Sequence, residues 1–143
     1  MPDSEDVVRE ARSWIGTPYN HMECKKGIAV DCVGLIKGVG LNLGYFTNNK
    51  GYPHTYSRFP NGFSLKDACD EYLDEISPSA NVVGSVVLFW LENPVLPTHL
   101  GIVSLIGGRF GLIHASSKAK KVIEHSFDEP LVSKVVSFYT FKN

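Results

Sequence analysis

The spacing of apolar residues predicts helices in the first half of the chain. In residues 4–15 apolar side chains recur at helical intervals, and acidic residues in the first turn favour the helix dipole. Residues 32–43 follow Asp31, a residue type that starts helices, and keep the same periodicity. Their three glycines weaken the helix but permit close approach by another backbone. A third helix is expected over residues 65–76, after a capping-box sequence beginning at Ser64.

The second half of the chain changes to short runs rich in β-branched and aromatic residues, which predict strands. The Gly107-Gly108 pair indicates a tight hairpin between the second run and the third. Helices followed by a mainly antiparallel sheet define an α+β fold, and we expect one domain spanning residues 1–143 because no repeat or linker is visible. The five expected strands cover residues 86–91, 100–106, 110–115, 121–125 and 132–141.

Between the two halves, residues 46–63 are rich in Gly, Pro, Asn and Tyr and have no sustained period. This composition predicts a long surface loop. Loops of that length are often functional, and we expect this one to shape a binding cleft.

Composition excludes several classes of partner. The hydrophobic content of 43% is ordinary for a soluble globular protein, and a formal charge of -1 provides no basic field for nucleic acid or an anionic membrane. The acidic N-terminus does not resemble a secretory signal, and no apolar run is long enough to span a bilayer, so we expect a product made in the cytoplasm. His21 and Cys24 lack a matching ligand pair elsewhere, so neither a metal nor another cofactor is expected.

The chain has three cysteines, too few for a disulfide framework. Cys32 stands at an expected helix start, where the helix N-terminus and a neighbouring imidazole would favour the reactive thiolate. The first-turn backbone N–H groups could also stabilise an oxyanion there. The alternative is a small buried structural residue. Cys69 falls on the apolar side of the third helix, and Cys24 is either a bystander or a residue that lines the cleft.

Two histidines supply the partners that a nucleophilic cysteine needs. If Gly107-Gly108 forms a two-residue loop, Gly101 lies opposite His114, and His99 is the diagonal neighbour of His114 on the same sheet face. A diagonal separation of about 7–8 Å is within reach of two imidazoles. A three-residue loop would instead put the two histidines on opposite faces. The other three histidines have no partner identifiable by spacing, and most of them are expected on the surface: His21, His54 and His125.

We therefore expect Cys32 to be a nucleophile, His99 its general base and His114 the residue that orients the base. Four segments then resemble the NlpC-type family of papain-like cysteine peptidases. Their order and spacing are closest to the branch of phage or gene-transfer-agent cell-wall peptidases, which share Gly-Thr-Pro-Tyr followed by His. The segments are Trp14 to Tyr19, Asp31 to Ile36, His99 to Val103 and Ile113 to Ala115.

The resemblance implies a minimal papain-like fold and hydrolysis of an amide in the peptidoglycan stem peptide, commonly between D-γ-glutamate and a diamino acid. It also implies that Tyr19 helps to hold the oxyanion and that Asp31 faces the substrate. Two positions depart from the family pattern. Val33 replaces the usual Ser after the cysteine, which puts recognition of a free amine in question, and Ser85 replaces the usual Asp before the first strand.

An enzyme with this substrate and no export signal would need delivery by a phage tail or a secretion apparatus, whose proteins are then expected partners. Two other functions remain open. One is a catalytically silent tail or assembly module that uses the fold for binding. The other is a thiol acyltransferase or deamidase that acts on lipid or protein.

Overall fold

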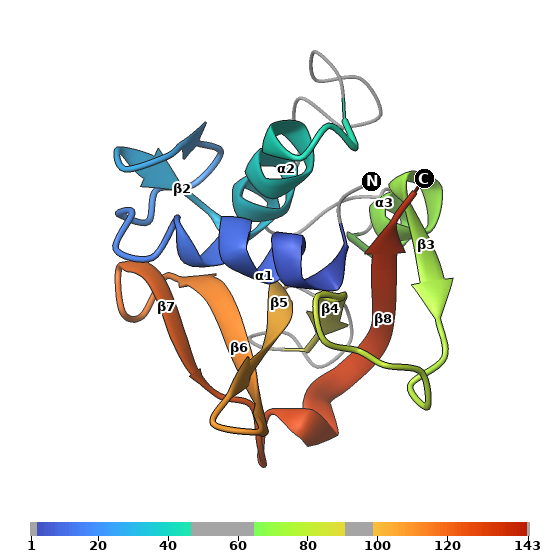
Figure 1. Ribbon diagram of the computed structural model, residues 1–143. Coiled ribbons are helices and arrows are strands. Elements are labelled where there is room, and N and C mark those ends of the chain that lie inside the picture. The colour runs from blue at the N-terminus through green and yellow to red at the C-terminus, as the bar shows by residue number, and fades with distance from the viewer. Residues whose placement is uncertain (1–2, 47–64, 91–98, 143) are drawn as a thin grey trace.

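The computed structural model of the chain describes residues 3–46, 65–90 and 99–142. In that part, helices lie along a six-stranded sheet whose order is β3-β8-β4-β5-β6-β7 (Figure 1). All neighbouring strands of this sheet are antiparallel. The helices are α1 (Ser4–Arg12), α2 (Cys32–Asn42) and α3 (Leu65–Tyr72). The strands of the sheet are β3 (Leu73–Ile76), β4 (Val86–Phe89), β5 (His99–Ile106), β6 (Arg109–Ser116), β7 (Lys121–Ser126) and β8 (Val135–Phe141).

Three smaller features complete the described chain. Strands β1 (Cys24–Lys25) and β2 (Ala29–Val30) form a separate two-stranded sheet just before α2, and the short 3-10 helix η1 (Val132–Lys134) leads into β8. None of these was expected from the sequence. Among the described residues, no helix combines the length and the apolar character needed to cross a membrane.

The α+β fold expected from the sequence is confirmed, but the expectation of five strands is wrong. The third helix ends at Tyr72, and the next four residues form the edge strand β3, in which Leu73 pairs with Phe141. Leu73 and Ile76 are three positions apart, a spacing that fits a helix, but pairing with β8 gives this backbone its hydrogen bonds and buries Leu73.

The expected loop at 46–63 lies outside the described residues except for Phe46, and so does His54.

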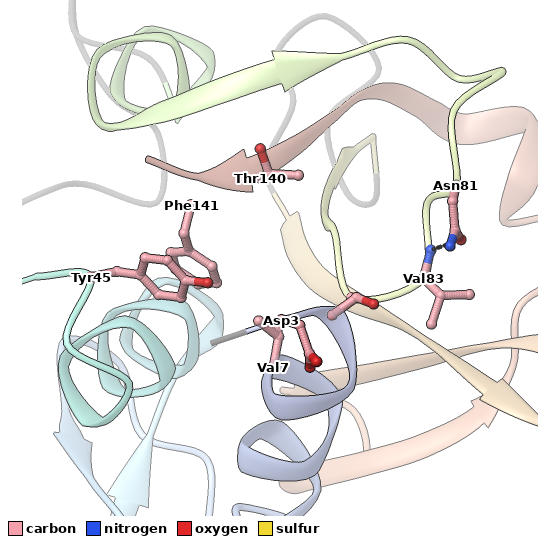
Figure 2. A pocket seen from close by; sticks show the side chains of 9 residues that line it. Asp3, Val7, Tyr45, Asn81, Val83, Thr140 and Phe141 are labelled. Atoms are coloured by element: carbon pink, nitrogen blue, oxygen red, sulfur yellow. Dashed lines mark hydrogen bonds between the residues drawn. The ribbon is translucent and has the colours of Figure 1, made fainter. Parts of the chain in front are cut away.

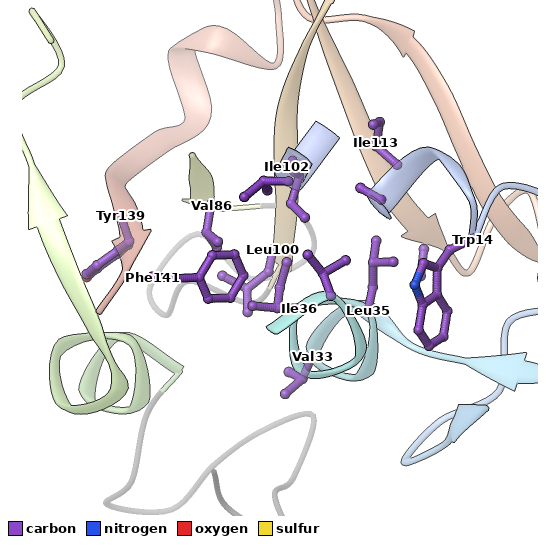
Figure 3. Packing of buried hydrophobic residues seen from close by; sticks show 14 of the residues in the cluster. Trp14, Val33, Leu35, Ile36, Val86, Leu100, Ile102, Ile113, Tyr139 and Phe141 are labelled. Carbon is purple, nitrogen blue, oxygen red and sulfur yellow. The ribbon is translucent and has the colours of Figure 1, made fainter. Parts of the chain in front are cut away.

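Helix α2 is the central helix of the fold and packs on β5 and β6. Its apolar residues lie in the main core with side chains from the sheet and from α1 (Figure 3). A Cβ atom at Gly34 would collide with the carbonyl oxygen of Glu23, which confirms that this glycine permits a close backbone approach. At Gly38 and Gly40 the close neighbours are instead aromatic rings, those of Trp14 and Phe46.

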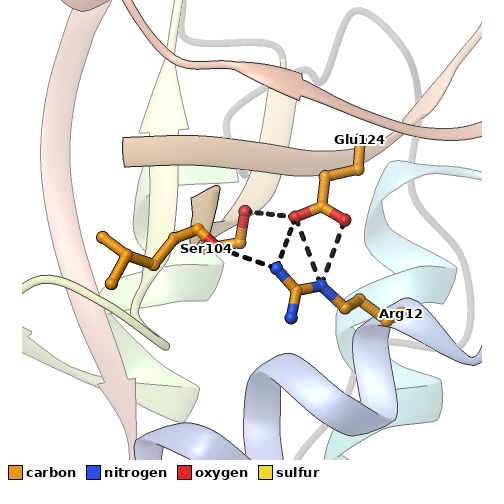
Figure 4. Close-up of polar contacts among 4 residues, drawn as sticks. Arg12, Ser104 and Glu124 are labelled. Atoms are coloured by element: carbon orange, nitrogen blue, oxygen red, sulfur yellow. Dashed lines mark hydrogen bonds and ion pairs between the residues drawn. The ribbon is translucent and has the colours of Figure 1, made fainter. Parts of the chain in front are cut away.

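A partly exposed ionic network ties α1 to the sheet (Figure 4). The Arg12 guanidinium donates to both oxygens of Glu124 at 2.9 to 3.3 Å, and also to the carbonyl oxygen of Leu105 at 2.9 Å. The Ser104 hydroxyl donates to Glu124 at 2.7 Å. Because these groups come from α1, β5 and β7, the network fixes the position of the first helix on the sheet.

Candidate active site

The β5–β6 hairpin has the two-residue loop that the sequence predicted. Ile106 pairs with Arg109 across Gly107 and Gly108, which both have positive φ. The register continues without a shift to Ile102 opposite Ile113, and one further step places Gly101 opposite His114. A Cβ atom at Gly101 would lie 3.2 Å from the Cβ of His114, so the glycine leaves room for the imidazole.

This register brings His99 and His114 together, as predicted. Nε2 of His99 lies 2.8 Å from Nδ1 of His114, and the two rings are nearly perpendicular, with centroids 5.0 Å apart. The side chains are buried, with exposures of 6% and 8%. The ring of Phe89 packs edge-on against His99 at a centroid distance of 5.1 Å, so one side of the imidazole is apolar.

His125 is partly exposed, and it has two hydrogen-bond partners that spacing in the sequence did not identify. Its Nε2 lies 2.8 Å from Nε2 of His114, and its Nδ1 lies 2.9 Å from the carbonyl oxygen of Ser126. Because His114 pairs with Ile123 and Leu112 pairs with His125, the new histidine is the diagonal neighbour of His114 on β7. The three histidines therefore form a row across three adjacent strands, here called the histidine row (His99, His114 and His125).

The middle member of the histidine row is held neutral. Burial, and secondly repulsion from His125, lower the pKa of His114 to about 4. At neutral pH the imidazole of His114 therefore carries one proton, and it must donate through one ring nitrogen and accept through the other.

Asp31 has a structural task that the sequence did not specify. It caps α2, since its Oδ1 accepts from the N–H of Gly34 at 2.8 Å, and its Oδ2 accepts from the N–H of Met22 at 2.7 Å. His21 lies 3.6 Å from the same Oδ2. Burial raises the pKa of Asp31, and the two backbone donors only partly offset this effect. At 1% exposure the carboxylate locks the loop before α2, and its role toward substrate stays a prediction.

Cys32 is the first residue of α2, as expected, and is half-buried against the main core. The first-turn N–H groups of a helix have no partners within the helix, so they are suited to hold a developing oxyanion. The helix packs on β5 and β6, the strands that carry His99 and His114. The contact of Cys32 with His99 and its role as nucleophile stay predictions.

The other two cysteines are held as thiols. The chain's three cysteines all lie in its described part, where they form no disulfide. Cys69 is in the core, as expected, and burial raises its pKa to about 12. The Cys24 thiol donates to the carbonyl oxygen of Gly34 at 3.1 Å, and burial raises its pKa as well. Cys24 thus supports the start of α2.

Tyr19 lies where the loop before α2 meets the β6–β7 turn. Its backbone N–H donates to the carbonyl oxygen of Lys120 at 2.9 Å, and it forms a parallel bridge with Val30 of β2. Its ring is partly buried against the main core. These contacts anchor the tyrosine, and its share in an oxyanion hole stays a prediction.

A cavity of about 290 Å³ opens at another place, beside the start of α1 and the end of β8 (Figure 2). Asp3, Val7, Tyr45 and Phe141 are among its lining residues, and the histidine row and Cys32 are not. Within the described ranges, no group of three His, Cys, Asp or Glu side chains is arranged to hold a metal ion.

A helix that begins with a cysteine and packs on a sheet bearing paired histidines is the architecture of a papain-like fold. No protein-family model and no curated protein matches the chain. Solved structures do match. NlpC1 from Trichomonas vaginalis superposes with a TM-score of 0.72 at 21% identity over 97% of this chain.

Two peptidoglycan hydrolases are similar at the same level. The NlpC/p60 domain of SagA gives a TM-score of 0.64 at 22% identity over 98% of the chain, and RipB from Mycobacterium tuberculosis gives 0.62 at 19% identity over 98%. The chain spans 44% of NlpC1, 65% of RipB and 100% of the SagA domain. The chain thus has the NlpC/P60 papain-like fold.

Proposed function

We propose that the chain is a cysteine peptidase that hydrolyses an amide bond in peptidoglycan stem peptides. The observation that carries this proposal is the hydrogen-bonded pair of buried histidines, His99 and His114, in a fold whose central helix begins at Cys32. The fold shared with peptidoglycan hydrolases supports the substrate class.

In the proposed reaction, Sγ of Cys32 attacks the carbonyl carbon of the stem-peptide amide while His99 takes the thiol proton. The oxyanion receives hydrogen bonds from the backbone N–H of Cys32 and the hydroxyl of Tyr19. Collapse of this intermediate breaks the C–N bond, and His99 returns the proton to the leaving amine. Water then hydrolyses the thioester, again with His99 as base. His114 keeps the His99 ring in the required orientation and tautomer.

For the scissile bond we propose the amide between D-γ-glutamate and a diamino acid such as meso-diaminopimelate. The support is the sequence resemblance around Cys32 and His99. Val33, which is buried in α2, has no hydroxyl, whereas many members of the family that the sequence resembles have a serine next to their cysteine. We therefore expect recognition of the stem peptide to depend less on a free amine.

The test is incubation of the protein with purified Gram-negative muropeptides and identification of the fragments by mass spectrometry. Wild type is expected to release fragments cut between glutamate and the diamino acid, whereas Cys32→Ala should release none. Cys24→Ala is the matched control because it removes a nearby thiol that already donates to Gly34, and it should remain active. Cleavage by Cys32→Ala, or no cleavage by folded wild type, would overturn the proposal.

We further propose that the enzyme reaches the cell wall as part of a phage tail or similar delivery particle. The support is the sequence resemblance from Gly16 to Tyr19 to the phage and gene-transfer-agent branch. Proteomic analysis of purified particles from the source should detect the chain at a fixed ratio to tail proteins. Its recovery only in particle-free fractions would count against this route.

A further inference from the structure

The histidine row continues past the pair that a nucleophile, base and orienter would need. Nε2 of His125 lies 2.8 Å from the remaining ring nitrogen of His114, and Nδ1 of His125 lies 2.9 Å from the carbonyl oxygen of Ser126. The row therefore has a fixed end, because a carbonyl oxygen only accepts hydrogen bonds.

This fixed end determines where each proton sits when the rings are neutral. Nδ1 of His125 must donate to the Ser126 carbonyl, so its Nε2 carries a lone pair and accepts from Nε2–H of His114. Neutral His114 then has its lone pair on Nδ1, which accepts from Nε2–H of His99. Nδ1 of His99 is left without a proton, which is the form that a general base requires.

We propose that His125 is a positioning residue. Because it donates to the Ser126 carbonyl, it must accept from His114, and His114 must then accept from His99, which fixes His99 as the Nε2–H tautomer. The tautomer assignment stands on the geometry of the row, and only its catalytic consequence rests on the proposed function. Any other tautomer of a single neutral ring would bring two lone pairs or two hydrogens face to face at one of the 2.8 Å contacts.

Two further observations agree with a positioning role. The lowered pKa of His114 keeps the centre of the row neutral at physiological pH, where a ring must use one nitrogen to donate and the other to accept. His125 itself is only half-buried, and both of its ring nitrogens lie within hydrogen-bond distance of a partner, Nε2 of His114 at 2.8 Å and the Ser126 carbonyl oxygen at 2.9 Å. Hydrogen bonds at both nitrogens therefore fix the orientation of its ring.

The test compares His125→Phe, which keeps a ring but removes the acceptor, with His125→Gln, whose amide oxygen can still accept from His114. Ring-nitrogen NMR of protein labelled with ¹⁵N-histidine, at about pH 8, distinguishes protonated from unprotonated nitrogens above the ordinary imidazole pKa of about 6.5. Wild type and His125→Gln should show Nε2–H tautomers at His99 and His114. In His125→Phe, His114 should lose this preference and become a mixture.

Activity provides the second readout. We expect His125→Phe to lower kcat on muropeptides about tenfold with KM unchanged, and His125→Gln to restore most of the rate. An Nδ1–H tautomer at His114 in wild type, or unchanged tautomers in His125→Phe, would overturn the proposal. A protein with the expected tautomers that cleaves no muropeptide would keep the positioning role of His125 and overturn the proposed function instead.

Discussion

Glu124 and His125 are consecutive residues of β7, yet they belong to two different polar networks. Because side chains alternate along a strand, Glu124 points toward α1 and His125 points to the other face of the sheet. Each network also reaches β5, through Ser104 on one face and His99 on the other. The same pair of strands therefore carries two polar clusters with different electrostatics.

The Glu124 network is a pair of full charges. Burial alone would raise the pKa of Glu124, but the Arg12 guanidinium and the Ser104 hydroxyl outweigh it and hold the pKa below its ordinary value. The histidine row joins imidazoles to one another and to the Ser126 carbonyl oxygen, and burial lowers the pKa of His114. Opposite charges make the first network a fixed structural tie, whereas the second is built from imidazoles, which can both donate and accept hydrogen bonds.

The largest expected effect is a loss of activity when the histidine row is changed, which distinguishes this row from the Glu124 network. His99→Ala should lower kcat/KM on muropeptides by about a thousandfold or more, because the thiol loses its general base. The thermal midpoint of unfolding should stay close to that of wild type, in contrast to the large loss of kcat/KM. Steady-state kinetics together with circular dichroism melting provides the measurement, and near wild-type activity in a folded variant would remove His99 from the mechanism.

The next effect is in the pH dependence of stability. The unfolded chain protonates a histidine near its ordinary pKa of 6.5, whereas folded His114 stays neutral down to about 4. The folded state therefore binds fewer protons in this window, and its stability falls as pH drops from 6.5 to 4, by about 3 kcal/mol in total.

Urea unfolding of wild type and His114→Gln at several pH values measures this contribution. The variant lacks the titrating ring, so its free energy of unfolding should fall less steeply between pH 6.5 and 4 than that of wild type. Parallel curves for the two proteins would show that His114 is not held neutral in the folded state.

Glu124→Gln should produce the opposite pattern to His99→Ala. Removing the charge leaves Arg12 and Ser104 with a weaker acceptor, so we expect a loss of about 1–3 kcal/mol in the free energy of unfolding at neutral pH. The activity per folded molecule should stay near wild type. Asp74→Asn is the matched control, since it disrupts an exposed pair with Lys142 and should have little effect on stability.

The smallest expected difference is between alanine substitutions at two glycines of the β5–β6 hairpin, Gly101 and Gly111. A Cβ at Gly101 would lie 2.7 Å from Leu112 and 3.2 Å from His114, whereas a Cβ at Gly111 would collide with Ser104. Alanine at either position should cost about 1–3 kcal/mol of stability through crowding. Only Gly101→Ala should also lower kcat, because it displaces a member of the histidine row. Equal kinetic effects of the two variants would contradict this separation.

Local sequence signals predicted the elements whose causes are local. Helix α2 begins after the capping side chain of Asp31, and Gly107-Gly108 sets the register that joins His99 to His114. A two-residue loop allows only one pairing of the strands, and side-chain alternation then puts both histidines on one face of the sheet.

His125 and β3 could not be predicted in the same way. The β6–β7 connection is a four-residue turn that ends with Lys120 in a left-handed conformation, and its sequence has no glycine to indicate the register. Leu73 and Ile76 fit a helix as well as a strand, and the choice depended on pairing with β8, far away in the chain.

The sequence by itself therefore determined the α+β fold and the start of α2 at Cys32, and it predicted the meeting of His99 with His114 on the condition of a two-residue loop. Only the tertiary structure decided that His114 has a second imidazole partner, that this partner ends on the Ser126 carbonyl, and that both oxygens of Asp31 are used within the protein. The physical reason is distance along the chain. Caps, periodicity and tight turns act between close neighbours, whereas the partners of a buried polar group are set by how separate elements pack.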